Sequence, residues 1–228
     1  LPDYTADVHR LVEEAGKAKG GVVYLCNPNN PTSSVTPKNR IAWLVNNLPP
    51  DTIALIDEAY IHFGETPDLE SALAHVRQGK NVVVTRTFSK IYGMAGLRAG
   101  FACARPDLIA QMAPFRNNVI SIVAVRAVLA AIAENKTLVP ERRAALGKTR
   151  RNLCNWLRER NLKYIEPNAN FMMIDVGRNA REFIYKMPSM GVAVGRPFPP
   201  LDNFLRVTIG TDSDMEKFRA VFWKVYQG

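Results

Sequence analysis

NVVVTRTFSKIYGMAGLRAG, residues 81–100, joins an apolar strand pattern to a polar turn that is rich in glycine. The first part, 81–87, carries a run of β-branched residues, which is typical of a strand buried on both faces. The turn that follows holds Lys90 among glycines, which allow a tight backbone path. A second apolar run, GFACA, begins ten residues after Lys90. Because a parallel crossover needs about a dozen residues or more, we expect the strand at 100–104 to be antiparallel to its neighbour.

Two similar apolar runs lie earlier in the chain, GVVYLC at 21–26 and TIALID at 52–57. Amphipathic helix patterns separate the runs, one starting just after Thr36 and one near 69–78. Alternation of buried strands and helices predicts an α/β fold, with a mostly parallel sheet and helices on both faces.

Each of these strands ends in a polar motif: NPNNPT at 27–32, DEAY at 57–60 and TFSK at 87–90. The carboxyl ends of parallel strands form the crevice in which α/β proteins bind their ligands. We therefore expect the three motifs, which are far apart in the sequence, to converge on one edge of the sheet and to form the functional site.

Capping residues and prolines predict where the helices begin. Thr5 is expected to cap a first helix, and Thr36 to cap the helix that follows it. Two further helices are expected near 119–134 and 139–160, the second opened by Pro140.

The C-terminal part has shorter strand patterns and a different order of elements. This pattern predicts a separate α+β domain. Its strand patterns are short: 171–176, 192–195 and 204–210. A helix pattern near 180–187 lies between them, and Thr211 is expected to cap a last helix. We therefore expect a large domain at 1–137 and a small domain at 138–228, which includes the interdomain helix.

Composition narrows the class of protein. The chain has 228 residues, 47% hydrophobic and 22% charged, which is ordinary for a soluble globular protein. No apolar run is long enough for a membrane span or placed as a signal peptide, so we expect no membrane association. Cys26, Cys103 and Cys154 form no CxxC pair, so neither a disulfide framework nor a metal site is predicted, and a cytoplasmic location is favoured.

The net charge of +9 raises the question of a nucleic-acid partner. The basic residues are spread along the chain, and their densest group lies on the predicted helix at 139–160, where charges usually form a solvated face. We therefore expect no nucleic-acid partner. A positive potential also suits an enzyme that handles anionic substrates.

Four motifs in order resemble fold type I pyridoxal-phosphate (PLP) aminotransferases, in particular the histidinol-phosphate aminotransferase-like branch. They are NPNNPT (27–32), IDEAY (56–60), TFSKIYGMAGLRAG (87–100) and LRVTIGT (205–211). The resemblance covers the whole chain. It implies a PLP enzyme that moves an amino group between an amino donor and a 2-oxo acid.

The resemblance gives three residues catalytic roles. It makes Lys90 the amine that forms a Schiff base with PLP and later moves a proton between carbon atoms. Asp57 resembles the carboxylate that keeps the pyridine nitrogen protonated, so that the ring can absorb the electrons of a carbanion. Tyr60, together with Asn30, resembles the residues that bond the ring's 3′-oxygen.

The remaining site residues resemble groups that bind anions. Thr87, Ser89 and Arg98 resemble the site of the cofactor phosphate, since two hydroxyls and a guanidinium suit a dianion. Arg206 resembles the arginine that binds the substrate's anionic group, and Arg196 a second arginine beside the substrate.

The chain departs from the family pattern in two ways. Ser33 stands where the turn after Thr32 usually carries glycine, which alters the turn without removing the chemistry. Family members also carry a long N-terminal portion before the residues that match. Since part of the sheet's cover comes from that portion, we expect residues 1–228 alone to expose a sheet edge and an apolar face. A homodimer is the form of cover that the family implies.

Lys90 and Asp57 do not distinguish between reactions on this fold. A PLP-dependent lyase or decarboxylase stays open. So do a non-catalytic aminotransferase-like sensor domain and an inactive fragment.

Overall fold

A four-stranded sheet is the main feature of the computed structural model, which describes residues 1–116 and 119–228. Its strands lie side by side in sequence order: β1 (Gly21–Cys26), β2 (Thr52–Asp57), β3 (Val82–Thr87) and β4 (Gly100–Cys103). The first three are parallel, and β4 is antiparallel to β3, with Thr87 opposite Gly100. The direction expected from the short connection after Lys90 is therefore confirmed.

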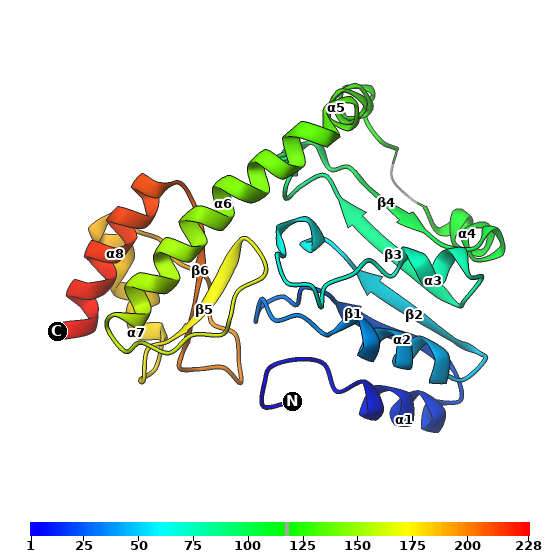
Figure 1. The fold of residues 1–228 in the computed structure, drawn as a ribbon, viewed down its shortest axis with the longest axis horizontal. Coiled ribbons are helices and arrows are strands. Elements are labelled where there is room, and N and C mark those ends of the chain that lie inside the picture. Colours follow the sequence, from blue (N-terminus) through cyan, green and yellow to red (C-terminus); the bar gives the residue numbers. More distant parts are fainter. Residues whose placement is uncertain (117–118) are drawn as a thin grey trace.

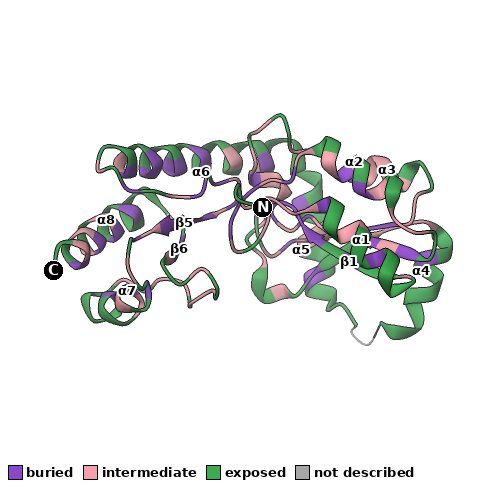
Figure 2. Ribbon diagram, turned by 90° about the horizontal axis from the view of Figure 1, so that it is seen from below, coloured by how far each residue is buried: buried purple, intermediate pink, exposed green. Residues whose placement is uncertain are grey.

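Helices lie on both sides of this sheet in Figure 2, but only one of its faces is closely packed against them. One face packs against three helices: α1 (Val8–Ala18), α2 (Lys38–Asn47) and α3 (Leu73–Arg77). Their core includes Ile41 and Leu44 of α2, which pack with Ile56 and Val82 of the sheet. On the other side lie α4 (Pro106–Met112) and α5 (Ile122–Ala133), and there Val22 and Tyr24 of β1 stay exposed. The predicted α/β fold is confirmed.

The C-terminal part forms a second hydrophobic core around a two-stranded antiparallel sheet. Its elements are β5 (Phe171–Asp175), α7 (Arg181–Lys186), β6 (Phe204–Thr208) and α8 (Asp212–Gln227). The long helix α6 (Asn135–Arg158) runs from the end of α5 to this unit, and contributes Leu153 and Leu157 to its core (Figure 1). Three short 3₁₀ turns accompany the large sheet, at Ile61–Phe63, Ala95–Leu97 and Ala113–Phe115, and a fourth, at Met187–Met190, follows α7.

The predicted start of the first helix is wrong by two residues. Asp7, not Thr5, caps α1, and its carboxylate accepts the Arg10 N–H. The Thr5 hydroxyl is engaged elsewhere, since it donates to Asp3 and accepts a bond from Arg40. Competing side-chain partners therefore move the cap.

Thr36 also does not act as a cap. Helix α2 begins at Lys38, after Pro37, and has no side-chain cap. Thr36 is buried, and its backbone N–H donates to Asn27 Oδ1 at 2.9 Å while Asn27 Nδ2 donates back to its carbonyl. This pairing fastens the two ends of the loop after β1 to each other.

Two other expectations are corrected by the structure. Pro140 lies inside α6, which already starts at Asn135, so the proline removes one intrahelical hydrogen bond instead of opening the helix. Residues 192–195 form no strand, although Gly195 donates one hydrogen bond to the Arg206 carbonyl. The cap at Thr211 is confirmed, because its side chain and that of Asp214 form a reciprocal capping box.

Apolar surface is exposed at the edge of the large sheet and on α5, as expected. Val22 and Tyr24 of the edge strand β1 are 63% and 56% exposed. On α5, Ile122 and Leu129 are 69% and 56% exposed. None of the helices in residues 1–116 and 119–228 is both long and apolar enough to cross a membrane.

Candidate active site

Lys90 lies three residues beyond β3, in a turn that is anchored on both sides. Phe88 and Ile91 are buried, and the Ile91 carbonyl accepts a bond of 2.8 Å from Arg142 on α6. Gly93 takes a φ of +72° and closes the turn by donating to the Lys90 carbonyl. The Lys90 side chain is exposed, and its Nζ lies 5.3 Å from the centroid of the Tyr60 ring. The sequence therefore places a free amine at the carboxyl end of the sheet.

Asp57 ends the neighbouring strand, β2, and is oriented by two hydrogen bonds. Its Oδ1 accepts the Ala59 N–H at 3.0 Å, and its Oδ2 accepts the Tyr24 hydroxyl at 2.9 Å. Cys26 lies directly opposite Asp57 in the sheet. Burial, and then the charge of Asp57, raises the pKa of Cys26 to about 11, so this thiol stays protonated at neutral pH. The carboxylate thus has a fixed direction and uncharged neighbours.

Tyr24 is a site residue that the sequence analysis missed. Burial, followed by the nearby Cys26 and Asp57, raises the pKa of its phenol, which keeps it a hydrogen-bond donor. The available indication was the two-residue period of a strand, which places Tyr24 on the same face as Cys26. The interpretation of residues 21–26 as a strand buried on both faces did not distinguish the face that carries Tyr24 and Cys26 from the other one.

A buried ion pair joins the ends of β2 and β3. Glu58 is 2% exposed, and its Oε2 accepts two bonds from the guanidinium of Arg86, at 2.8 and 2.9 Å. Ser71 and the Ala72 N–H also bond this carboxylate. Because Glu58 follows Asp57 and Arg86 precedes Thr87, the pair fixes the spacing between the two strand ends that carry candidate site residues.

Tyr60, Phe171 and Arg206 form a stack that connects the two sheets. The Tyr60 and Phe171 rings meet edge to face with centroids 5.0 Å apart, and the Arg206 guanidinium lies 4.0 Å from the Phe171 centroid. Desolvation lowers the pKa of Arg206, and the neighbouring Tyr60 opposes that shift. Among the described residues the buried Arg206 Nε has no hydrogen-bond partner. A buried, unpaired cationic donor favours an anionic ligand at this position.

Arg196 lies beside Arg206 in the structure. Both were expected to lie next to the substrate. Both guanidinium groups lie over the Phe198 ring, at 4.3 Å for Arg196 and 5.3 Å for Arg206. The positive charge of Arg196 contributes to the lowered pKa of Arg206. Two adjacent cations therefore border the Phe198 ring.

The candidate phosphate residues lie at the start of the lysine turn. The Thr87 hydroxyl accepts the Ser89 N–H at 3.0 Å, so these two residues are in contact. Arg98 is exposed, takes a φ of +54°, and donates to the Ala95 carbonyl. It lies two residues before Gly100, the partner of Thr87 across the sheet.

Asn30 lies exposed in the loop after β1. Within residues 1–116 and 119–228, its side chain has no hydrogen bond to Tyr60, and Arg98 has none to Thr87 or Ser89. The structure therefore brings Lys90 together with Tyr60, and Arg206 together with Phe171 and Arg196. It shows no direct bond from Asn30 or Arg98 to the residues expected to share their roles.

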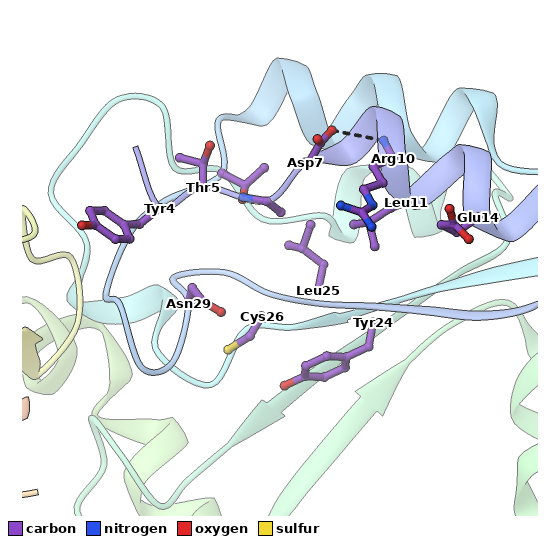
Figure 3. Close-up of a pocket in the computed structure, with 12 residues that line it drawn as sticks. Tyr4, Thr5, Asp7, Arg10, Leu11, Glu14, Tyr24, Leu25, Cys26 and Asn29 are labelled. Atoms are coloured by element: carbon purple, nitrogen blue, oxygen red, sulfur yellow. Dashed lines mark hydrogen bonds between the residues drawn. The ribbon is translucent and has the colours of Figure 1, made fainter. Parts of the chain in front are cut away.

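Two hollows border this region. Figure 3 shows one of about 410 Å³ along the free edge of β1, where Leu25 faces α1 and Tyr24 points to the other side of the strand. A more open one of about 640 Å³ is lined by Lys90 together with residues of α6 and Asn170. We place the candidate site at Lys90, because its amine lies over the ring of Tyr60, which in turn contacts the Phe171 ring beneath Arg206.

Comparisons with known proteins identify the family of the chain. Residues 2–222 match the family described as aminotransferase class I and II. The chain belongs to the class I and II aminotransferase family. The histidinol-phosphate aminotransferase of Moorella thermoacetica is 36% identical over 86% of this chain and 52% of its own length. That of Symbiobacterium thermophilum is 36% identical over 96% of this chain and 60% of its own.

A solved structure supports the same assignment. The histidinol-phosphate aminotransferase of Sinorhizobium meliloti, in complex with pyridoxal-5′-phosphate, superposes with a TM-score of 0.90 at 27% identity. The match covers 100% of this chain and 63% of that protein. The chain thus spans between about half and two thirds of the length of these relatives.

Proposed function

We propose that the chain is the lysine-bearing part of a PLP-dependent aminotransferase, which moves an amino group between an amino donor and a 2-oxo acid. The observation that carries the proposal is the Lys90 amine, exposed above Tyr60 and one strand away from the fixed carboxylate of Asp57. Family membership supports it.

The donor set at the end of the sheet suits PLP. In the proposal Lys90 holds the cofactor's aldehyde carbon and transfers a proton, and Asp57 keeps a proton on the pyridine nitrogen. Tyr60 and Asn30 bond the 3′-oxygen. When bound, PLP supplies an electron sink for a carbanion. Its phosphate is assigned to the following residues: Thr87, Ser89 and Arg98.

The unpaired donor of Arg206 supports a substrate with an anionic group. In the proposal Arg206 binds that group and Arg196 adds charge beside it, since both guanidinium groups border the Phe198 ring. A carboxylate or a phosphate suits this pair. The relatives' names favour an amino-phosphate or amino-acid donor.

The assembly is part of the same proposal. We assign residues 1–137 to a large PLP-binding domain and 138–228 to a small domain, a division supported by the two separate cores. The exposed apolar residues of β1 and α5 support self-association as a homodimer. Three free cysteines suit a reducing compartment such as the cytoplasm.

The test is a product assay on the full-length protein with PLP. Amino donors, among them histidinol phosphate, glutamate and aromatic amino acids, are each offered with a 2-oxo acid acceptor, and the new amino acid is measured by mass spectrometry. We expect amino transfer that is lost in Lys90→Ala. Release of carbon dioxide or elimination products without amino transfer would instead identify a decarboxylase or a lyase.

A further inference from the structure

Ser33 is fully buried and takes a backbone conformation that favours glycine. Its φ is +63°, and its relative exposure is 0%. A left-handed backbone is unfavourable for a residue with a Cβ atom, and it persists only where the surroundings hold it. The serine at this position therefore calls for a compensating interaction.

The Ser33 hydroxyl makes that interaction with a distant segment. Its Oγ accepts the N–H of Asn168 at 2.9 Å and that of Ala169 at 2.8 Å. Asn168 also donates to the Ser33 carbonyl at 3.0 Å, whereas Ala169 has the hydroxyl as its only acceptor among the described residues. Glycine would supply the backbone conformation but would leave the Ala169 N–H without a partner.

The tethered segment is held from a second direction. Arg150 on α6 is buried and donates to the carbonyl of Ala169 at 3.3 Å and to that of Phe63 at 3.0 Å. Two residues beyond Ala169 stands Phe171, whose ring contacts both Tyr60 and Arg206. The position of residues 168–169 thus helps to set where the Phe171 ring lies, together with the pairing of β5 and β6.

We propose that Ser33 is a positioning residue for the anion-binding site. Its hydroxyl ties the loop that carries Asn30 to residues 168–169, and so holds Phe171 and Arg206 against Tyr60. Ser33 acts through the backbone and contacts neither cofactor nor substrate. The inference rests on the proposed role of Arg206 in binding the substrate's anionic group.

Amide hydrogen exchange in the full-length protein tests the tether itself. Ser33→Ala removes the hydroxyl and keeps the strained backbone, whereas Ser33→Gly removes the hydroxyl and relieves the strain. We expect the Ala169 amide to exchange about tenfold faster in both variants, with the amides of β2 unchanged. Native-like protection of Ala169 in both variants would overturn the proposal.

Ligand affinity tests the positioning role. Calorimetric titration of the PLP-loaded protein with 2-oxoglutarate, an anionic 2-oxo acid, should give a dissociation constant that is about fivefold higher or more in both variants, with PLP affinity unchanged. If Ala169 exchanges faster while the affinity for 2-oxoglutarate stays native, Ser33 is only structural and the proposal is wrong.

Ser34→Ala is the matched control. Ser34 is also buried, but its hydroxyl donates to the Tyr4 carbonyl and contacts Thr32, not residues 168–169. Both readouts should stay native in this variant, and equal effects would overturn a specific role of Ser33. If the native protein neither binds 2-oxoglutarate nor transfers amino groups, the proposed function fails and the positioning role falls with it. Amide exchange still decides whether the tether exists.

Discussion

Asp57 shows how a single strand end can orient a carboxylate. The Ala59 N–H and the Tyr24 hydroxyl each occupy one of its oxygens, and the adjacent Cys26 thiol stays uncharged. In the proposed enzyme this carboxylate stabilises the protonated pyridine nitrogen. Its effect is then electrostatic and depends on its negative charge.

Replacing Asp57 by Asn tests this role. The variant keeps the shape but cannot form an ion pair with the pyridine nitrogen, so turnover should fall by about 10²–10³ while PLP affinity falls less. Steady-state kinetics and a cofactor titration on the full-length protein provide the two numbers. Near-native turnover would exclude the electron-sink role of Asp57.

Arg206 and Arg98 are assigned to different anions, and their variants should therefore differ. Arg206→Lys keeps the charge but loses the two-pronged geometry, so the KM for an anionic donor should rise. Arg98→Ala should weaken PLP binding instead. A variant of Arg206 that loses PLP and keeps its KM would show that the two roles are exchanged.

A side chain that stands in a local motif can be proposed as a site residue from the sequence, whereas a bond between side chains far apart in the chain cannot. Lys90 and Arg206 stand in motifs that can be recognised from their neighbours in the chain. Tyr24 and Ser33 bond residues that are 33 and 135 positions away, and no local pattern indicates such a pair. The departure from glycine at Ser33 was visible in the sequence, but the partner of its hydroxyl was not.

At the scale of the elements, the ends of β2 and β3 are joined by the pair Glu58–Arg86. Removing Glu58 leaves the guanidinium of Arg86, 18% exposed in its side chain, without its charge partner. Glu58→Ala should therefore lower the free energy of unfolding by about 3–5 kcal/mol. Denaturant unfolding of the full-length protein measures this change.

The exposed pair Lys38–Glu70 offers the control for that experiment. Glu70→Ala removes a carboxylate from a solvent-exposed ion pair and should have a much smaller effect. Equal losses of stability in the two variants would mean that the buried pair does not join the strand ends as the structure indicates.

The strand positions of the large sheet were predictable because long apolar runs with β-branched residues have few alternatives, whereas the short run at 192–195 forms no strand. Helix starts were less predictable, because a cap needs only one hydrogen bond and several side chains compete for it. Thr5 and Thr36 each have the right chemistry for a cap, yet the Thr5 hydroxyl bonds Asp3 and the Thr36 hydroxyl accepts the Ala6 N–H, both outside the helices. The cap predicted at Thr211 is present, and a reciprocal bond from the Asp214 side chain reinforces it.

At the scale of the whole molecule, the order of strands and helices predicted the large sheet and its antiparallel strand. The same order did not predict how the two sheets pack against each other. That packing depends on contacts such as Tyr60 with Phe171 and Ser33 with Ala169, which join parts of the chain more than 100 residues apart. The site spans this junction. Its function therefore depends on both cores being correctly assembled.

Covalent attachment of PLP to Lys90 tests the central claim most directly. The full-length protein is loaded with PLP, reduced with borohydride, digested and mapped by mass spectrometry, with Lys90→Ala treated in parallel. We predict a pyridoxyl group on the peptide that contains Lys90, and loss of visible absorbance in the variant. A pyridoxyl group on another lysine, or none in the native protein, would contradict the account.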